Sequence, residues 1–298
     1  MITMCGEGLV DLVPISRQPL APLQPALGGG PFNAAIAASR LGAPTQFLSR
    51  ISSDSFGHAL VNKLAEEGVD TSLVQRGPEP TTLALTSIGA DGSASYTFYT
   101  EGTADRLVDP PADLRTDIAC FGTCSLALEP GASRYAALLR RLASADTLIA
   151  LDPNIRSFYA TAEHRAFLRS LLPDVTLLKL SEEEVEFMGE TDVLVRVITR
   201  GADGLTVETR GMRIDVPALN VSVSDTIGAG DTIMGALLAQ IDARANGKPR
   251  ELIEQLSADD WREILRYAAT AAAITCSRIG AQPPTHAEVE SLMVASSS

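Results

Sequence analysis

The chain has 298 residues, 45% of them hydrophobic, so it can bury a sizeable core as one large domain or two small ones. Lys and Arg number 24 against 37 Asp and Glu, which gives a formal charge of -13. This acidic excess argues against a general binder of nucleic-acid phosphates or of anionic membrane surfaces. A nucleotide would therefore have to be held locally, by backbone amides, a cation and a few side chains.

Other classes of site are also disfavoured by composition. The four cysteines are too few and too irregularly spaced for a disulfide framework or a usual zinc site, and we expect reduced core residues. His58, His164 and His286 have polar neighbours and are predicted to lie at the surface without a role. No apolar run approaches the roughly 18 residues of a membrane span, and the N-terminus has no signal-like pattern. We expect a cytoplasmic protein.

The first segments alternate between strand and helix patterns. Residues 2–5 form an apolar run closed by Gly6, which is typical of a buried strand. Asp11 follows this run, as an acid does at the carboxyl edge of a parallel sheet, and it could grip hydroxyl groups there. An ordinary solvated loop acid is the alternative. A strand at 46–51 and a helix at 53–67 continue a series of βαβ units.

A glycine-rich turn precedes the first predicted helix. Three glycines at 28–30, then a proline and an alanine-rich run that stops at Gly42, are signals of a helix start and a helix end. The small alanines would let this helix approach another element closely. Glycine amides beside Asn33 could hydrogen-bond a polyol. A tight turn feeding a buried helix explains the glycines equally well, although it leaves Asn33 unexplained.

Two segments interrupt the alternation. Residues 14–26 are rich in proline and fit neither a helix nor a central strand. Residues 83–88 and 95–100 are rich in β-formers, and the turn residues 89–92 between them predict a hairpin. We expect these segments to form a small sheet over the active site. The predicted organisation is one domain, residues 1–298, with lid segments inserted at about 12–27 and 83–105.

Polar clusters follow two of the later predicted strands. The strand at 148–151 is followed by Asn154 and Arg156, and the strand at 176–178 is followed by a stretch that contains Ser181. Open α/β sheets bind ligands at the carboxyl ends of their strands. We therefore expect these side chains to bind ligands, and we assign Arg156 to the substrate and Asn154 and Ser181 to the cofactor.

The stretch that contains Ser181 has a second interpretation. Ser181 could cap a helix, and Glu184 could complete a capping box with it. The acidic run at 182–184 could equally be a solvated first turn. Beyond it we expect a strand at 195–199, a hairpin at 205–216, helices at 233–241 and 261–276, and an ordered region that ends near residue 284.

Residues 225–231 carry the strongest chemical signal in the chain. Glycines at 228 and 230 allow consecutive backbone amides to converge on one point. The first amides of the helix that follows have no intrahelical partner, and the helix dipole adds positive charge, so the turn could hold a phosphate. Asp231 would then be placed to accept a proton from an incoming hydroxyl group. The alternative is that Asp231 only caps the helix.

The turn at 28–33 and the stretch at 225–231 resemble the two signature regions of the ribokinase-like (PfkB) carbohydrate kinases. The resemblance extends from Gly6 to about Pro283. It implies a doubly wound, mostly parallel α/β sheet with helices on both faces and a small β-sheet lid. It also implies an ATP-dependent phosphotransferase that acts on a sugar hydroxyl.

The resemblance implies roles for individual residues. Asp231 matches the catalytic base, and the anion hole is matched by Gly228, Ala229 and Gly230. The sugar-gripping positions are matched by Asp11, Gly29, Gly30 and Asn33. The loop beside the nucleotide is matched by Thr199, Gly201 and Gly204, with Arg200 as a phosphate contact.

The resemblance also implies ATP, Mg²⁺ and a monovalent cation, with K⁺ as the candidate. Glu184 matches the acidic end of an Asn-x-x-Glu motif linked to magnesium, but Ser181 replaces the asparagine, so that contact would pass through water. The monovalent-cation site would lie near Asp225 and use backbone around Ile227, Thr275, Arg278 and Gly280. Pro284 replaces a serine that is common at the end of that loop, which leaves the potassium preference open.

The expected partners are a small sugar and ATP, with no nucleic acid and no membrane, and a homodimer could form through the lid edge. The form of the motifs is similar to bacterial fructokinases and 2-keto-3-deoxygluconate kinases. We favour fructose, converted to its 6-phosphate, because a keto acid needs a cation and the lid offers few. Arg156 could supply one, so that kinase, a ribokinase or a nucleoside kinase stays open. A non-catalytic sugar or nucleotide sensor is the alternative outside the enzymes.

Overall fold

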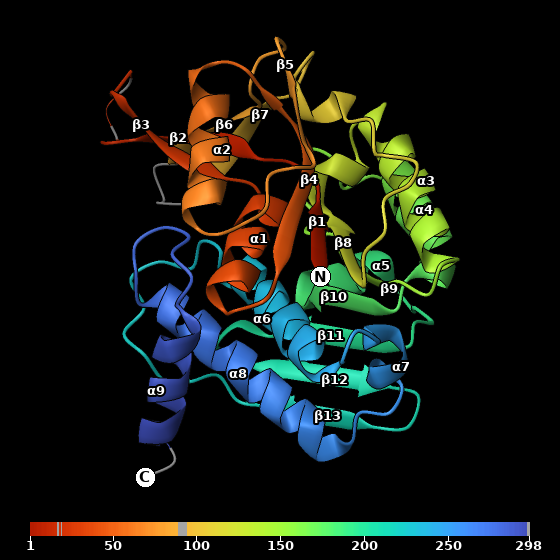
Figure 1. Cartoon of the computed structure of the whole chain (residues 1–298). Helices are drawn as coiled ribbons and strands as arrows, with labels where there is room; N and C mark the ends of the chain where they lie inside the picture. The colour runs from red at the N-terminus through yellow and green to blue at the C-terminus, as the bar shows by residue number, and fades with distance from the viewer. Residues whose placement is uncertain (17, 19, 89–93, 297–298) are drawn as a thin grey trace.

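The computed structural model describes residues 1–16, 18, 20–88 and 94–296, and the turn predicted at 89–92 lies outside them. Figure 1 shows its elements coloured from red at the N-terminus to blue at the C-terminus. The strands of the described residues form a large sheet and a small sheet.

The large sheet is mostly parallel. Its strands are β1 (Ile2–Cys5), β4 (Thr45–Ser52), β5 (Val74–Gly77), β8 (Ile118–Gly122), β9 (Leu148–Asp152), β10 (Leu177–Ser181), β11 (Val195–Thr199), β12 (Leu205–Thr209) and β13 (Arg213–Val216). Within the described residues their order is β13-β12-β11-β10-β9-β8-β1-β4-β5. The strands from β5 to β11 pair in parallel, and β12 and β13 add an antiparallel end. Every residue of β8 and β9 is buried, as expected for strands covered on both faces.

Helices cover both faces of this sheet (Figure 1). The first face carries α1 (Gly30–Arg40), α2 (Ser55–Glu66), α6 (Ala229–Arg244), α7 (Pro249–Ile253) and α8 (Ala258–Cys276). The second face carries α3 (Gly131–Ala143), α4 (Ala162–Leu171) and α5 (Glu182–Met188). Each face has its own hydrophobic core. Alternate residues of β4 serve the two cores, with Phe47 on the first face and Leu48 on the second.

The small sheet confirms the predicted excursion from the main sheet. It consists of β2 (Leu9–Pro14), β3 (Leu23–Gly28), β6 (Leu83–Ile88) and β7 (Ala94–Tyr99), in the order β3-β2-β6-β7. β2 and β6 pair in parallel, and the two outer strands pair with them in antiparallel fashion. The proline-rich segment thus supplies an outer strand, where proline is tolerated because one side of the strand needs no partner.

Two predictions about segment ends are wrong. The chain does not fray after residue 284, because α9 (His286–Ser296) follows and buries Val289 in the core of the first face. The strand predicted at 176–178 extends to Ser181, so Lys179 is a strand residue and is buried. Lys179 can be buried in the strand because it has a charged partner, Asp152.

Two predictions about individual side chains are also wrong. Asp11 lies within β2 of the small sheet and not in a loop after β1, because the chain turns at Gly6 and immediately starts a second strand. His164 is buried at 9% exposure, against the aromatic rings of Tyr159 and Phe167. By contrast, Cys5, Cys120 and Cys124 are buried free thiols and Cys276 is a partly buried one, as predicted.

The alanine-rich helix α1 packs closely against α6, as its small side chains predicted. The contact is made at Gly235 of α6. A Cβ atom there would lie 2.7 Å from Cβ of Ala37 and 2.9 Å from the carbonyl oxygen of Ala34. These two helices begin at the two glycine-rich turns, so their contact fixes the distance between the turns.

We expect Gly235→Ala to lower the free energy of unfolding by about 1–3 kcal/mol, because α1 and α6 would have to separate. That cost would outweigh the gain of about 1 kcal/mol that alanine brings to an open helical position. Urea denaturation measures the change. Gly211→Ala is the matched control, since its added Cβ would meet nothing within 4 Å. Equal stabilities of the two variants would contradict the close contact.

Candidate active site

Asp231 lies in the first turn of α6, directly after the glycine turn. The helix starts at Ala229, and its N-cap is Gly228, with a φ of 76° and no side-chain cap. A Cβ at 228 would lie 2.6 Å from Cβ of Ala281, so both the backbone angle and the space require glycine. Asp231 is therefore not the helix cap, which excludes that alternative. Its carboxylate is free to face the turn at the start of α1.

Asn33 of α1 donates a hydrogen bond from Nδ2 to Oδ2 of Asp231, at 2.8 Å. Burial raises the pKa of Asp231 to about 6, while the Asn33 amide and the Lys179 ammonium oppose the rise. The carboxylate is thus ionised near neutral pH, yet it has a higher proton affinity than a surface aspartate. A carboxylate in this state can accept a proton from a hydroxyl group.

A second carboxylate lies on the lid side of the same turn. A Cβ at Gly28 would lie 2.5 Å from Oδ2 of Asp11, so the Asp11 side chain rests on the glycine turn. Burial raises the pKa of Asp11 to about 6, and the charge of Arg156 opposes it. The structure therefore brings together Asp11, from the lid, and Arg156, from the loop after β9.

Three side chains from different elements meet at Gly30. A Cβ at this position would lie 2.6 Å from Cγ2 of Thr123, 3.1 Å from Nδ2 of Asn154 and 3.4 Å from Oδ1 of Asp231. Asn154, assigned to the cofactor from the sequence, thus has its amide beside the turn that was assigned to the sugar. The absence of a side chain at residue 30 leaves room for a small polar molecule next to Asp231.

Buried hydrogen bonds support this turn from below. The carboxylate of Glu7 accepts hydrogen bonds from the hydroxyl groups of Thr123, at 2.6 Å, and Ser125. A Cβ at Gly29 would lie 2.7 Å from the carbonyl oxygen of Glu7. Burial raises the pKa of Glu7, and the two hydroxyl groups oppose it. Thr123 could not be identified from the sequence, because its hydrogen bond to Glu7 depends on β8 lying next to β1.

The cofactor-side residues lie on neighbouring strands. Ser181 at the end of β10 is the register partner of Thr199 at the end of β11. Arg200, Gly201 and Gly204 follow Thr199 in the next turn. Arg200 forms an ion pair with Asp215, at 3.2 Å. The carboxyl edge of the large sheet thus carries Glu7, Thr123 and Asn154 after β1, β8 and β9, and Ser181 and Thr199 at the ends of β10 and β11.

The capping box predicted at the start of α5 is confirmed. Ser181 caps the helix, and Oε2 of Glu184 accepts the Ser181 amide at 2.7 Å. Oε1 of Glu184 accepts the Ile155 amide at 2.6 Å. Glu184 is buried, unlike Glu182 and Glu183, so only part of the acidic run is solvated. Its carboxylate joins the loops that follow β9 and β10.

The carboxylate of Asp225 joins two loops near the glycine turn. Oδ1 accepts the amide of Ile227 at 3.0 Å, and Oδ2 accepts the amide of Gly280 at 2.8 Å. The carbonyl oxygen of Gly280 accepts one backbone amide and has a second lone pair, whereas that of Thr275 accepts the amides of Ser277 and Arg278. Arg278 forms an ion pair with Glu288 through its side chain.

The donor set fits a metal carried by a nucleotide better than a metal held by the protein alone. Among the described residues, no group of three or more His, Cys, Asp or Glu side chains could hold a metal ion. Mg²⁺ is commonly bound by one or two carboxylates together with substrate phosphates and water. The two oxygens of Glu184 each accept one amide, and their remaining lone pairs could face such an ion.

A buried ion pair behind the site was missed from the sequence. Nζ of Lys179 lies 2.8 Å from Oδ2 of Asp152. An isolated charge inside apolar strands is the signal that could have identified it, since such a charge needs a partner. The pairing itself depends on β9 and β10 being neighbours.

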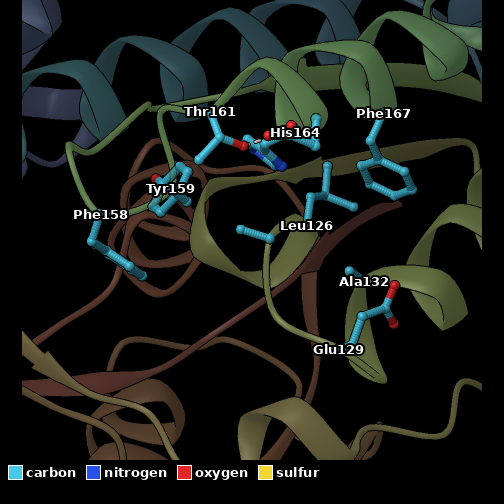
Figure 2. A pocket seen from close by; sticks show the side chains of 10 residues that line it. Leu126, Glu129, Ala132, Phe158, Tyr159, Thr161, His164 and Phe167 are labelled. Carbon is cyan, nitrogen blue, oxygen red and sulfur yellow. Dashed lines mark hydrogen bonds between the residues drawn. The ribbon is translucent and has the colours of Figure 1, made fainter.

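A separate pocket of about 390 Å³ lies behind the loop that carries Asn154. Figure 2 shows that Phe158, Tyr159, His164 and Phe167 line it, and Asp231 is not among the lining residues. The Tyr159 hydroxyl donates to the carbonyl oxygen of Asn154. Tyr159, which lines the pocket, thus helps to hold the loop in place.

The glycine turn at a helix N-terminus, the adjoining carboxylate and the polar carboxyl edge of the sheet define a phosphotransferase that acts on a hydroxyl group. The chain belongs to the pfkB family of carbohydrate kinases, whose family model matches residues 20–288. Its fold is ribokinase-like, and its acceptor is a sugar hydroxyl.

Three similar proteins illustrate this relationship. A fructokinase of Rhizobium leguminosarum bv. trifolii is 37% identical over 265 residues, which cover 81% of this chain and 79% of that protein. A probable fructokinase of Arabidopsis thaliana is 32% identical, over 98% of this chain and 96% of its own. The structure of a fructokinase with bound ATP from Xylella fastidiosa superposes with a TM-score of 0.91 at 26% identity, over 100% and 99% of the two chains.

We expect Asp231→Asn to raise the free energy of unfolding at pH 8. The pKa of Asp231 is raised from 3.8 to about 6, so the folded state binds the proton more tightly and stability falls as the pH rises through this range. Asparagine has no charge to desolvate. The expected gain is about 1–2 kcal/mol, below the ~3 kcal/mol of a fully buried carboxylate, because the side chain is only partly buried.

Urea denaturation of both proteins at pH 8 and pH 4 measures this gain, which should shrink at the lower pH. A variant that is less stable than the parent at pH 8 would contradict the conclusion that burial disfavours the charge of Asp231.

Proposed function

We propose that this chain is an ATP-dependent kinase that transfers the γ-phosphoryl group to fructose and makes fructose 6-phosphate. The observation that carries the proposal is the position of Asp231, which faces Asn33 from the first turn of α6, beside the bare glycine turn. The base, the amides for the transferring group and the space for a sugar hydroxyl then adjoin one another.

In this proposal Asp231 is the general base that takes the proton of the sugar hydroxyl. The amides of Gly228, Ala229 and Gly230, at the positive end of α6, stabilise the charge on the transferring phosphoryl group. A pKa of about 6 suits the task, because the carboxylate is ionised at neutral pH and still has an appreciable proton affinity.

The remaining residues would hold the two substrates. The sugar would be held by Asp11, Gly29, Gly30, Asn33 and Arg156. The nucleotide would be held by Asn154, Ser181, Thr199, Arg200, Gly201 and Gly204. Asp11 can accept hydrogen bonds from two neighbouring hydroxyl groups, and Arg156 can donate to a third.

Fructose is supported by the relatives and by the charge of the site. The two curated relatives carry the name fructokinase, and the Xylella fastidiosa structure is a fructokinase with bound ATP. On the acceptor side Arg156 is exposed and its charge acts on Asp11. Because the charge of Arg156 is already balanced by the carboxylate of Asp11, this side of the site favours a neutral sugar over a negatively charged keto acid.

Two ions would assist the reaction. Mg²⁺ would be carried by the ATP phosphates and neutralise part of their charge, with Glu184 near it through water. K⁺ would lie by the loops that Asp225 joins, near Ile227 and Arg278, with the carbonyl oxygens of Thr275 and Gly280 as donors.

Release of ADP in a coupled assay with ATP and Mg²⁺ tests the proposed function. The acceptors are fructose, 2-keto-3-deoxygluconate, ribose, glucose and adenosine, each with and without K⁺. We expect the highest kcat/KM for fructose and a higher rate with K⁺. A preference for 2-keto-3-deoxygluconate would assign Arg156 to its carboxylate. Protein that binds ATP but turns over none of these acceptors would contradict the proposal.

The small sheet is proposed to act as a lid that closes over the sugar and excludes water. Its contacts with the rest of the chain support this. Asp11 of β2 reaches the glycine turn, and the ring of Phe98 of β7 packs against that of Phe158, with the ring centroids 4.5 Å apart. Its outer face carries exposed apolar side chains, Leu23 and Tyr99 among them. A second copy of the chain would cover that face and form a homodimer.

No helix of the described residues is long and apolar enough to cross a membrane. We place the enzyme in the cytoplasm, where ATP and free sugars are both present.

We expect hydrogen exchange in β2, β3, β6 and β7 to slow when fructose and an ATP analogue are added together. Closure would protect amides that open easily in the free protein. Exchange followed by mass spectrometry measures this, with α7 as the internal control because Arg250 of α7 contacts Thr176 just before β10, at the edge of the sheet opposite the site. Equal protection with and without the substrates would contradict a moving lid.

A further inference from the structure

The ion pair of Lys179 and Asp152 is buried directly behind the glycine turn. The two side chains are only 6% and 9% exposed, and Nζ lies within 2.9 Å of both carboxylate oxygens. A Cβ at Gly230 would lie 3.6 Å from Nζ. Gly230 immediately precedes Asp231, so the ammonium group lies against the backbone that carries the proposed base.

Burying a lysine in this position needs a reason, because desolvation costs several kcal/mol even when the charge is paired. A hydrophobic pair of similar volume would hold β9 and β10 together at least as well. The burial of Lys179 opposes its charge, and the carboxylates of Asp152, Glu184 and Asp231 outweigh this and raise its pKa. Lys179 is therefore a permanent positive charge.

Charged and titratable groups act on Asp231 from several strands and loops of the sheet. They are Glu7 after β1, Cys120 on β8, Asp152 on β9, Arg156 in the following loop and Lys179 on β10, with Glu184 of α5 acting on Asp152 and Lys179. Burial raises the pKa of Cys120 well above its usual range, so this thiol is neutral.

Two of these groups are cations, and they differ in exposure. Arg156 is exposed, so water and salt weaken its effect. Lys179 is buried, so its effect is retained. It is thus the principal positive charge that can keep Asp231 ionised among the surrounding acids.

We propose that Lys179 and Asp152 are positioning residues for the base: the buried ammonium group favours the charged form of Asp231, and Asp152 limits that effect. This inference rests on the proposed role of Asp231. In the transfer step, the hydroxyl proton passes to Asp231 as the new O–P bond forms and the bond to ADP breaks. Lys179 exchanges no proton in this step and acts only through its field.

The pH dependence of kcat/KM for fructose tests this inference in Lys179→Met and Asp152→Asn. In the parent enzyme, activity should rise with pH through about 6, where Asp231 ionises. This rise is the acidic limb of the pH profile. Lys179→Met, which removes the positive charge, should move the limb to higher pH by about one unit. Asp152→Asn, which removes the negative charge, should move it to lower pH by about one unit. A purely structural pair would lower activity equally at all pH values.

The double variant Lys179→Met/Asp152→Asn protects the test against misfolding, because no buried charge is left unpaired. Its acidic limb should fall between those of the single variants. Glu208→Gln is the matched control, since it breaks the remote ion pair of Arg196 and Glu208 and should leave the limb unchanged. Urea denaturation shows that each variant is folded.

The outcomes separate this inference from the proposed function. In one outcome, Asp231→Asn is inactive while the folded Lys179 and Asp152 variants all keep the parent's acidic limb. In that case the positioning role of Lys179 and Asp152 is wrong, and the assignment of Asp231 as the base stands. If Asp231→Asn retains turnover, the base assignment fails first. Limbs that move in opposite directions support the inference.

Discussion

The carboxylate of Asp231 is held where burial disfavours its charge, and most of the surrounding structure compensates for this. The Asn33 amide and the Lys179 ammonium stabilise the ionised form. The start of α6 adds the positive end of a helix dipole. The close contact of α1 and α6 keeps Asn33 within 2.8 Å of the carboxylate. A proton acceptor of raised affinity is therefore maintained at some cost in stability, as is common at active sites.

The parallel sheet determines which groups can meet at this carboxylate. Since β1, β8, β9, β10 and β11 are parallel neighbours, their carboxyl ends present Glu7, Thr123, Asn154, Ser181 and Thr199 along one edge. The glycine turns at the starts of α1 and α6 lie at this edge, and both helices pack on the first face of the sheet. The small sheet adds Asp11, whose side chain reaches the turn at Gly28. In the proposed function, a sugar and a nucleotide approach this edge from opposite ends.

The sequence predicted the features that depend on local chemistry. The glycine turns, the parallel sheet, the hairpin at 83–100 and the capping box of Ser181 and Glu184 follow from residue type and spacing, and the structure has all four, apart from the hairpin's turn, which lies outside the described residues. The errors arose where a long-range partner decides the outcome. Lys179 can be buried because Asp152 of the neighbouring strand pairs with it, and His164 lies in a pocket that it shares with Leu126 and Ala132. These partners are distant in sequence from Lys179 and His164.

Asp231→Asn tests the account most directly, because it removes the proposed base and changes little volume. Turnover of fructose and ATP should fall by several orders of magnitude, while fructose binding measured by calorimetry should stay within a few-fold of the parent. That combination would show that the carboxylate acts in the chemical step and not in holding the sugar. Turnover close to that of the parent would contradict the account, whatever the affinity for fructose.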